Sequence, residues 1–164
     1  MLQQTAAENK TRKSGLLSSL STGHVETKEK KKIIGYLTED YIAAFNVAAN
    51  LSSHGKWIPY PFLADRLKKI SDELRVQGEL FRAKLTLLGG TVPQLATENR
   101  EDGDFRQNVR RLVKDMEDHA SRSETLIHQR NNIRDESVVA LIDTIVSEMQ
   151  KQKDELLDIV MRLS

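Results

Sequence analysis

The sequence predicts an all-α protein, and three observations lead to that fold class. Of the 164 residues, 30% are charged and 5% are aromatic, and there are only three prolines and eight glycines. This composition is typical of a helical protein with few turns. Four segments carry apolar residues at spacings of three and four, the period of a helix that buries one face. Short breaks separate the first from the second segment and the third from the fourth, which favours a four-helix bundle.

The first helix is expected over about residues 30–53, with Gly55 ending it and the Pro59 and Pro61 turn forcing an extended exit. Its predicted apolar face consists of Ile33, Ile34, Leu37, Tyr41, Ile42, Phe45, Ala48 and Leu51. The turn is short, so the second helix should run antiparallel to the first.

The second helix is expected to begin near Phe62 and to stop at Gly89 and Gly90, with Pro93 preventing its resumption. Its predicted buried face consists of Leu63, Leu67, Ile70, Leu74, Leu80, Phe81, Leu85 and Leu88. Residues 91–104 lack a helical period and exceed the usual bundle connection of about two to eight residues. We therefore expect a long crossover between helices two and three, which would make them parallel.

The third helix is expected over about residues 104–131, with Asp104 as its N-cap, and the fourth over about residues 135–163. The predicted core face of the third helix is Phe105, Val109, Leu112, Val113, Met116, Ala120, Ser123, Leu126 and Ile127. That of the fourth is Val138, Val139, Leu141, Ile142, Ile145, Val146, Met149, Leu156, Ile159, Val160 and Leu163.

Residues 1–29 have the composition of a flexible polar and basic tail, separate from a bundle over residues 30–164. The basic residues in and next to this tail are Lys10, Arg12, Lys13, Lys30, Lys31 and Lys32. A solvated tail is the favoured interpretation, and an arm that touches an anionic partner is the alternative.

Composition excludes several function classes. Cysteine is absent, which rules out disulfides and thiolate chemistry, and 25 basic residues nearly balance 24 acidic ones. Neither a membrane-spanning run, a signal-peptide core nor a phosphate-binding glycine loop is found. We expect a cytoplasmic protein without membrane contact.

Two motifs resemble the ferritin-like superfamily. Leu85-Thr-Leu-Leu-Gly-Gly-Thr-Val-Pro93, which closes the second helix, resembles the corresponding stop in bacterioferritins, rubrerythrin-type proteins and Dps proteins. Ala43-Ala-Phe-Asn46 is similar to a stretch of the bacterioferritin first helix. The resemblance covers about residues 31–163 and implies a ferritin-like bundle with a di-iron centre.

The di-iron ligands of that family are missing. They comprise one Glu from each of two helices and a Glu-x-x-His pair from each of the others, and this chain contains no Glu-x-x-His. The resemblance places the ligand positions on Tyr41, Leu74, Gln77, Met116, Met149 and Gln152. We therefore expect apolar and amide side chains in the middle of the bundle. Gln77 and Gln152 are predicted to bond to each other or through a buried water, unless both lie on the surface.

Other cofactor sites find little support. Arg75 stands where the resemblance places a haem-ligating Met, and Ala83 replaces one acid of the Dps-type iron site. Weak alternative candidates for a metal are Glu73, Glu117 and Glu148. The leading hypothesis is thus a structural or interaction protein without a di-iron centre or other cofactor.

We expect a homodimer or a larger assembly. The chain stops soon after the fourth helix, without the fifth helix of a 24-subunit cage, and Trp57 and Tyr60 could anchor a dimer through helices one and two. The rival hypotheses are an iron-binding oxidoreductase or iron-storage protein with non-standard ligands, and a Dps-like protein that binds DNA through its basic tail.

Overall fold

The computed structural model describes the backbone of residues 2–96 and 103–164, and the side chains of residues 27–96 and 103–164. Four helices make up its regular structure: α1 (Leu2–Gly55), α2 (Pro61–Leu87), α3 (Phe105–Asn131) and α4 (Glu136–Leu163). The described residues contain no strand. The all-α prediction is therefore confirmed.

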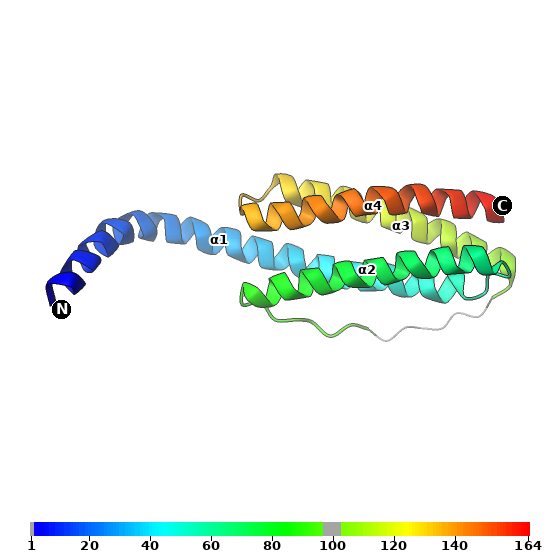
Figure 1. Ribbon diagram of the computed structural model, residues 1–164, viewed down its shortest axis with the longest axis horizontal. Coiled ribbons are helices and arrows are strands. Elements are labelled where there is room, and N and C mark those ends of the chain that lie inside the picture. Colours follow the sequence, from blue (N-terminus) through cyan, green and yellow to red (C-terminus); the bar gives the residue numbers. More distant parts are fainter. Residues whose placement is uncertain (1, 97–102) are drawn as a thin grey trace.

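The helices lie side by side as a bundle (Figure 1). α1 packs against α2 and α3, and α4 packs against α3 and α2. Figure 1 shows α2 and α3 both beginning at the end of the bundle where α1 stops and α4 finishes. Each neighbouring pair is therefore antiparallel, while α2 and α3 run in the same direction.

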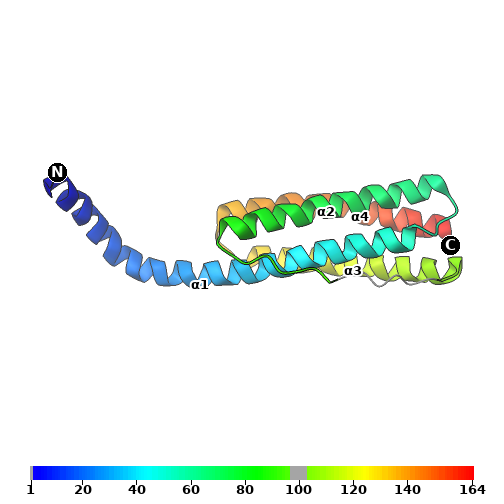
Figure 2. The same ribbon diagram turned by 90° about the horizontal axis from the view of Figure 1, so that it is seen from below.

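The first helix is longer than the sequence predicted. α1 begins at Leu2 rather than near Lys30, and its first half projects past the bundle (Figure 2). The first proline of the chain is Pro59, so no residue before it forbids continuation of the helix. Among the side chains of α1 that the structure describes, from Thr27 onward, the first in the core is Ile33.

Local stop and start signals act where the sequence placed them. α1 ends at Gly55, and Gly89, just after α2, has a φ of 81°. Asp104 caps α3 by accepting a 2.8 Å bond from the backbone N–H of Gln107, whose side chain accepts one from Asp104 N–H. Asp135 caps α4 by accepting from the backbone N–H groups of Ser137 and Val138, and its hydrogen bond from the Ser137 hydroxyl lowers its pKa.

The core is divided into two apolar clusters along the bundle. One, near the α1–α2 turn, includes Leu51, Leu67, Leu74, Leu112 and Leu156. The other, toward the opposite end, includes Leu37, Tyr41, Phe81, Leu126 and Met149. On α2, α3 and α4 the residues between the clusters include buried polar side chains. The stability of the bundle comes from burying these two clusters, because apolar area removed from water contributes about 25 cal/mol per Å².

Some predicted core positions are wrong. Leu80, Phe105 and Ile127 are exposed rather than buried. The face that α3 turns inward is instead Asn108, Leu112, Asp115, His119, Ser123, Leu126 and Gln129. The apolar residues Val109, Val113 and Met116 are partly buried against the first cluster. The helix is therefore rotated relative to the prediction, and its inward face carries polar residues, of which Asp115 bonds to α1 and His119 bonds to α4.

No helix among the described residues is long and apolar enough to cross a membrane.

Candidate functional site

Four buried polar residues lie between the two apolar clusters, and we call them the polar layer: Gln77 of α2, His119 and Ser123 of α3, and Gln152 of α4. Each occupies a core-facing position between residues of the two clusters. Gln77 follows Leu74 and precedes Phe81, and Gln152 lies between Met149 and Leu156. The fold therefore brings these polar groups to the middle of the bundle.

His119 and Gln152 join α3 to α4. His119 Nε2 lies 2.9 Å from Gln152 Oε1, and Gln152 Nε2 lies 3.5 Å from Glu148 Oε1. Since the amide oxygen accepts, His119 donates from Nε2 and its Nδ1 carries no proton. Burial lowers the pKa of His119, and the Gln152 bond only partly opposes this. Burial therefore favours the neutral imidazole in the layer.

The predicted bond between Gln77 and Gln152 is not formed. Both side chains are about 2% exposed, so neither lies on the surface, but Gln152 bonds to His119 and the Gln77 Nε2 group has no partner. His119 Nδ1 and Ser123 Oγ are also buried without a partner. The prediction that only apolar and amide side chains fill the middle of the bundle was wrong, because the imidazole of His119 is buried there as well.

Two of the three candidate metal ligands lie near each other at the α2–α4 edge of the layer. Burial raises the pKa of Glu73, and the nearby carboxylates of Glu148 and Glu155 raise it further. Glu117 is exposed on α3. Among the described residues, no group of three or more His, Asp or Glu side chains is arranged to hold a metal ion.

The remaining positions that the resemblance assigns to lost ligands carry apolar side chains. Tyr41, Leu74 and Met149 are buried in the two clusters, and Met116 is half-buried against the first. The rings of Tyr41 and Phe45 pack edge to face, with their centroids 5.1 Å apart. These side chains fill the space between helices by packing.

A buried ion pair joins α1 to α3 near the layer. Arg122 contacts Asp40, whose side chain is fully buried, and burial lowers the pKa of the Arg122 guanidinium. Arg122 also lines an open hollow of about 350 Å³ between α1 and α3, beside Asn46 and Asn50. The arginine thus reaches from the surface to neutralise a carboxylate inside the bundle.

A second buried pair lies at the end of the bundle where α1 stops. His54 Nδ1 is 2.5 Å from Asp115 Oδ2, and both side chains are almost fully enclosed. Burial raises the pKa of Asp115, while the hydrogen bond to His54 opposes that rise. Together, the two pairs set the position of α3 relative to α1.

Sequence reasoning missed all of these polar contacts. The predicted core face of the third helix left out Asp115 and His119, which charged residues surround in the sequence. Their spacing carried the missing signal, since Leu112, Asp115, His119 and Leu126 recur at intervals that place them on one face. Asp40 likewise lies three residues after Leu37 and four before Ala44, both of which are core residues.

The predicted interaction residues fall into two groups. Lys30, Lys31 and Lys32 are exposed near the bundle, and Lys32 donates to the Asn132 carbonyl. Lys10, Arg12 and Lys13 belong to the projecting part of α1, and their side chains lie outside the described residues. Trp57 and Tyr60 are both about half exposed at the α1–α2 turn.

Comparison with known proteins yields a likeness of fold. No family model and no curated protein matches the sequence. The chain resembles the crystal structure of protein XCC3681 from Xanthomonas campestris pv. campestris str. ATCC 33913, with a TM-score of 0.56 and 13% sequence identity. The match covers 82% of this chain and 92% of that one. At this level of identity the likeness shows the helical fold alone.

Proposed function

We propose that this protein is a non-catalytic structural or interaction module, built on a ferritin-like bundle with a long crossover between α2 and α3. The crossover is supported by the parallel course of those helices in Figure 1, with residues 88–104 between them. The ferritin-like assignment rests on the two sequence motifs at Ala43–Asn46 and Leu85–Pro93.

The observation that carries the proposal is the bond between His119 and Gln152. A dinuclear metal centre needs several carboxylates and imidazoles that point at the ion pair. Here the imidazole is neutral and engaged by an amide, and the aligned positions hold Tyr41, Leu74 and Met149. Apolar and amide groups are stable in a dry bundle without a cation, whereas a carboxylate cluster is not.

The rival with a specific observation in its favour is an iron-binding oxidoreductase or iron-storage protein. Glu148 lies close enough for its charge to raise the pKa of Glu73, and a cation between the two carboxylates would relieve that repulsion. Iron would in that case bind at the edge of the layer.

Metal titration separates the two functions. Protein purified without chelator is titrated anaerobically with Fe²⁺ and Mn²⁺, and the same is done with Glu73→Gln and Glu148→Gln. The proposal predicts no stoichiometric binding. When the Fe²⁺-treated samples are then exposed to air, it predicts no oxygen uptake beyond that of Fe²⁺ in buffer alone. Binding of one or two ions per chain that is lost in both variants, but kept in the matched control Glu117→Gln, would establish the metalloprotein instead.

A DNA-binding role through the basic residues of α1 makes a different prediction. The protein would have to bind DNA at low salt, and its affinity for DNA would have to fall steeply with added salt and vanish when residues 1–29 are deleted. We expect no such binding, because the net charge of the chain is only +1.

A further inference from the structure

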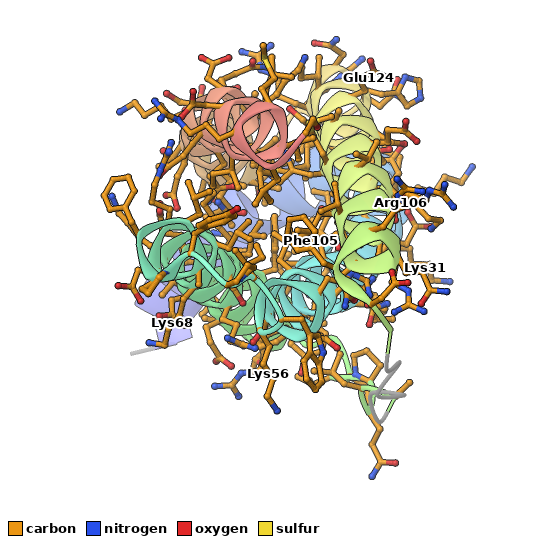
Figure 3. All side chains as sticks on the ribbon, turned by 90° about the vertical axis from the view of Figure 1, so that its right-hand side faces the viewer. Lys31, Lys56, Lys68, Phe105, Arg106 and Glu124 are labelled. Carbon is orange, nitrogen blue, oxygen red and sulfur yellow. The ribbon has the colours of Figure 1, made fainter. Side chains whose placement is uncertain are left out.

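The outer side of α2 carries six charged residues that alternate in sign, and we call them the charged row. In chain order they are Asp65, Lys68, Asp72, Arg75, Glu79 and Arg82. Their spacings of three and four residues place them on one side of the helix. Figure 3 shows Lys68 on the outer side of α2, pointing away from the other helices.

The charged row is not used by the bundle. The ion pairs that its members form stay within α2: Lys68 and Arg75 each lie 3.4 Å from Asp72, and Arg82 lies 2.7 Å from Glu79. α2 contacts its neighbours through other residues. Ser71 donates to the Ala48 carbonyl of α1, and Arg66 bonds to Glu155 and Asp158 of α4.

The order of charges in this row is complementary to itself when reversed. If a second α2 lies antiparallel, with a two-fold axis level with Glu73 and Leu74, Asp65 meets Arg82, Lys68 meets Glu79 and Asp72 meets Arg75. Every one of these pairs is of opposite sign, and the two-fold symmetry repeats each pair. A parallel, in-register pairing would place like charges together.

Exposed apolar residues form a stripe beside the row, about a quarter turn around α2 from its middle. Tyr60 and Phe62 lie at the start of α2 and Leu87 at its end, and Phe62 and Leu87 are 71% and 76% exposed. In the antiparallel arrangement the start of one helix meets the end of the other, so Phe62 falls beside Leu87 of the second copy. Val76, which is 60% exposed, lies near the axis.

We infer that α2 docks on a second copy of this chain, antiparallel, through the charged row and its flanking apolar residues. The inference rests on the proposed function only in treating the chain as an interaction module, and it names the partner. Tyr60 to Leu87 spans about 40 Å of helix, and a helix is about 10–12 Å wide. That strip of about 400–480 Å² per copy is at the low end for specific interfaces. The dimer should therefore dissociate in the micromolar range and weaken with salt.

Charge-swap variants test this pairing. An acidic variant carries Lys68→Glu, Arg75→Glu and Arg82→Glu, and a basic variant carries Asp65→Lys, Asp72→Lys and Glu79→Lys. Their masses are measured by light scattering over a concentration series. Wild type should approach twice the 18.6 kDa of one chain. Each variant alone should remain monomeric, with a dissociation constant raised on the order of 100-fold by like-charge contacts. An equimolar mixture should form a one-to-one heterodimer.

Controls keep the test independent of folding and of metal. Lys114→Glu on α3 reverses an exposed, ion-paired lysine outside the row and should leave the dimer intact. If a triple variant loses its helical circular-dichroism signal, the single variants Lys68→Glu and Glu79→Lys are used instead. Each alone places like charges at the contacts between positions 68 and 79. In a heterodimer of the two variants, both of these contacts again pair opposite charges. A monomeric wild type, or a wild-type dimer unaffected by the variants, would overturn the inference. Metal binding would refute the proposed function but would leave this result unchanged.

Discussion

Replacing His119 with glutamine should abolish a pH dependence of stability that the buried imidazole imposes. His119 is 0% exposed, and it donates from Nε2 to Gln152. A glutamine at this position can offer its amide N–H to the same acceptor, but it does not titrate. The substitution therefore removes a proton-binding group while keeping the hydrogen bond between α3 and α4.

The magnitude follows from proton linkage. Burial lowers the pKa of His119 from its ordinary 6.5, so the unfolded chain binds a proton at a pH where the folded chain does not. The stabilisation is therefore fully present above pH 6.5 and is lost as the pH falls below it. If the folded imidazole stays neutral at pH 5.5, the free energy of unfolding decreases by about 1.4 kcal/mol between pH 7.5 and pH 5.5 because of this residue.

Urea unfolding followed by circular dichroism at pH 7.5 and 5.5 measures this loss for the wild type and for His119→Gln. Other groups titrate in both proteins. Burial raises the pKa of Glu73, so its contribution has the opposite sign and is lost as the pH rises above 4.5. The difference between the two proteins isolates the contribution of His119. His128→Gln, which alters an exposed histidine, serves as the matched control.

The wild type should lose about 1 kcal/mol more stability than His119→Gln on acidification, and His128→Gln should behave as the wild type. Equal losses in wild type and His119→Gln would mean that the imidazole binds a proton in the folded chain as readily as in the unfolded chain, as a solvated histidine does. That result would refute a neutral polar layer.

Two further substitutions test how the helices are held together, both by urea unfolding at neutral pH. Arg122→Leu should lower the free energy of unfolding by about 3–5 kcal/mol, because it leaves Asp40 charged and buried. Adding Asp40→Leu to this variant should restore most of that stability. A decrease of less than about 1 kcal/mol in Arg122→Leu would show that the ion pair is solvated. Gly78→Ala should cost about 1–3 kcal/mol because its new methyl group would collide with the Phe45 ring of α1. Gly35→Ala, which meets nothing within 4 Å, should instead stabilise by about 0.5–1 kcal/mol, and equal effects at the two glycines would refute the close approach of α1 and α2.

The helix boundaries within the bundle were predictable because their signals are local. Gly55, the Gly89–Gly90 pair and the Asp104 cap each act on the backbone within a few residues, so they have the same effect in any fold. The start of α1 was not predictable in this way. A polar composition indicates that a segment buries little apolar surface, but it does not decide whether the segment is helical. The part of α1 outside the bundle is helical from Leu2.

The polar layer depends on contacts between distant residues, which no local pattern supplies. His119, Asp40 and Arg122 look like surface residues until their partners are known. The inward face of α3 was therefore assigned to its apolar residues, of which Phe105 and Ile127 proved exposed. The rule that apolar residues mark the buried face of a helix fails where a buried polar group has a hydrogen-bond partner.

The central claim is that the middle of the bundle holds a neutral, metal-free imidazole bonded to an amide. Nitrogen NMR of the ¹⁵N-histidine-labelled chain at pH 7.5 tests it directly, before and after addition of Mn²⁺. We expect His119 to carry one proton, on Nε2, with Nδ1 bare and with signals that paramagnetic Mn²⁺ leaves sharp. A doubly protonated ring, or signals lost at one equivalent of Mn²⁺, would contradict the claim.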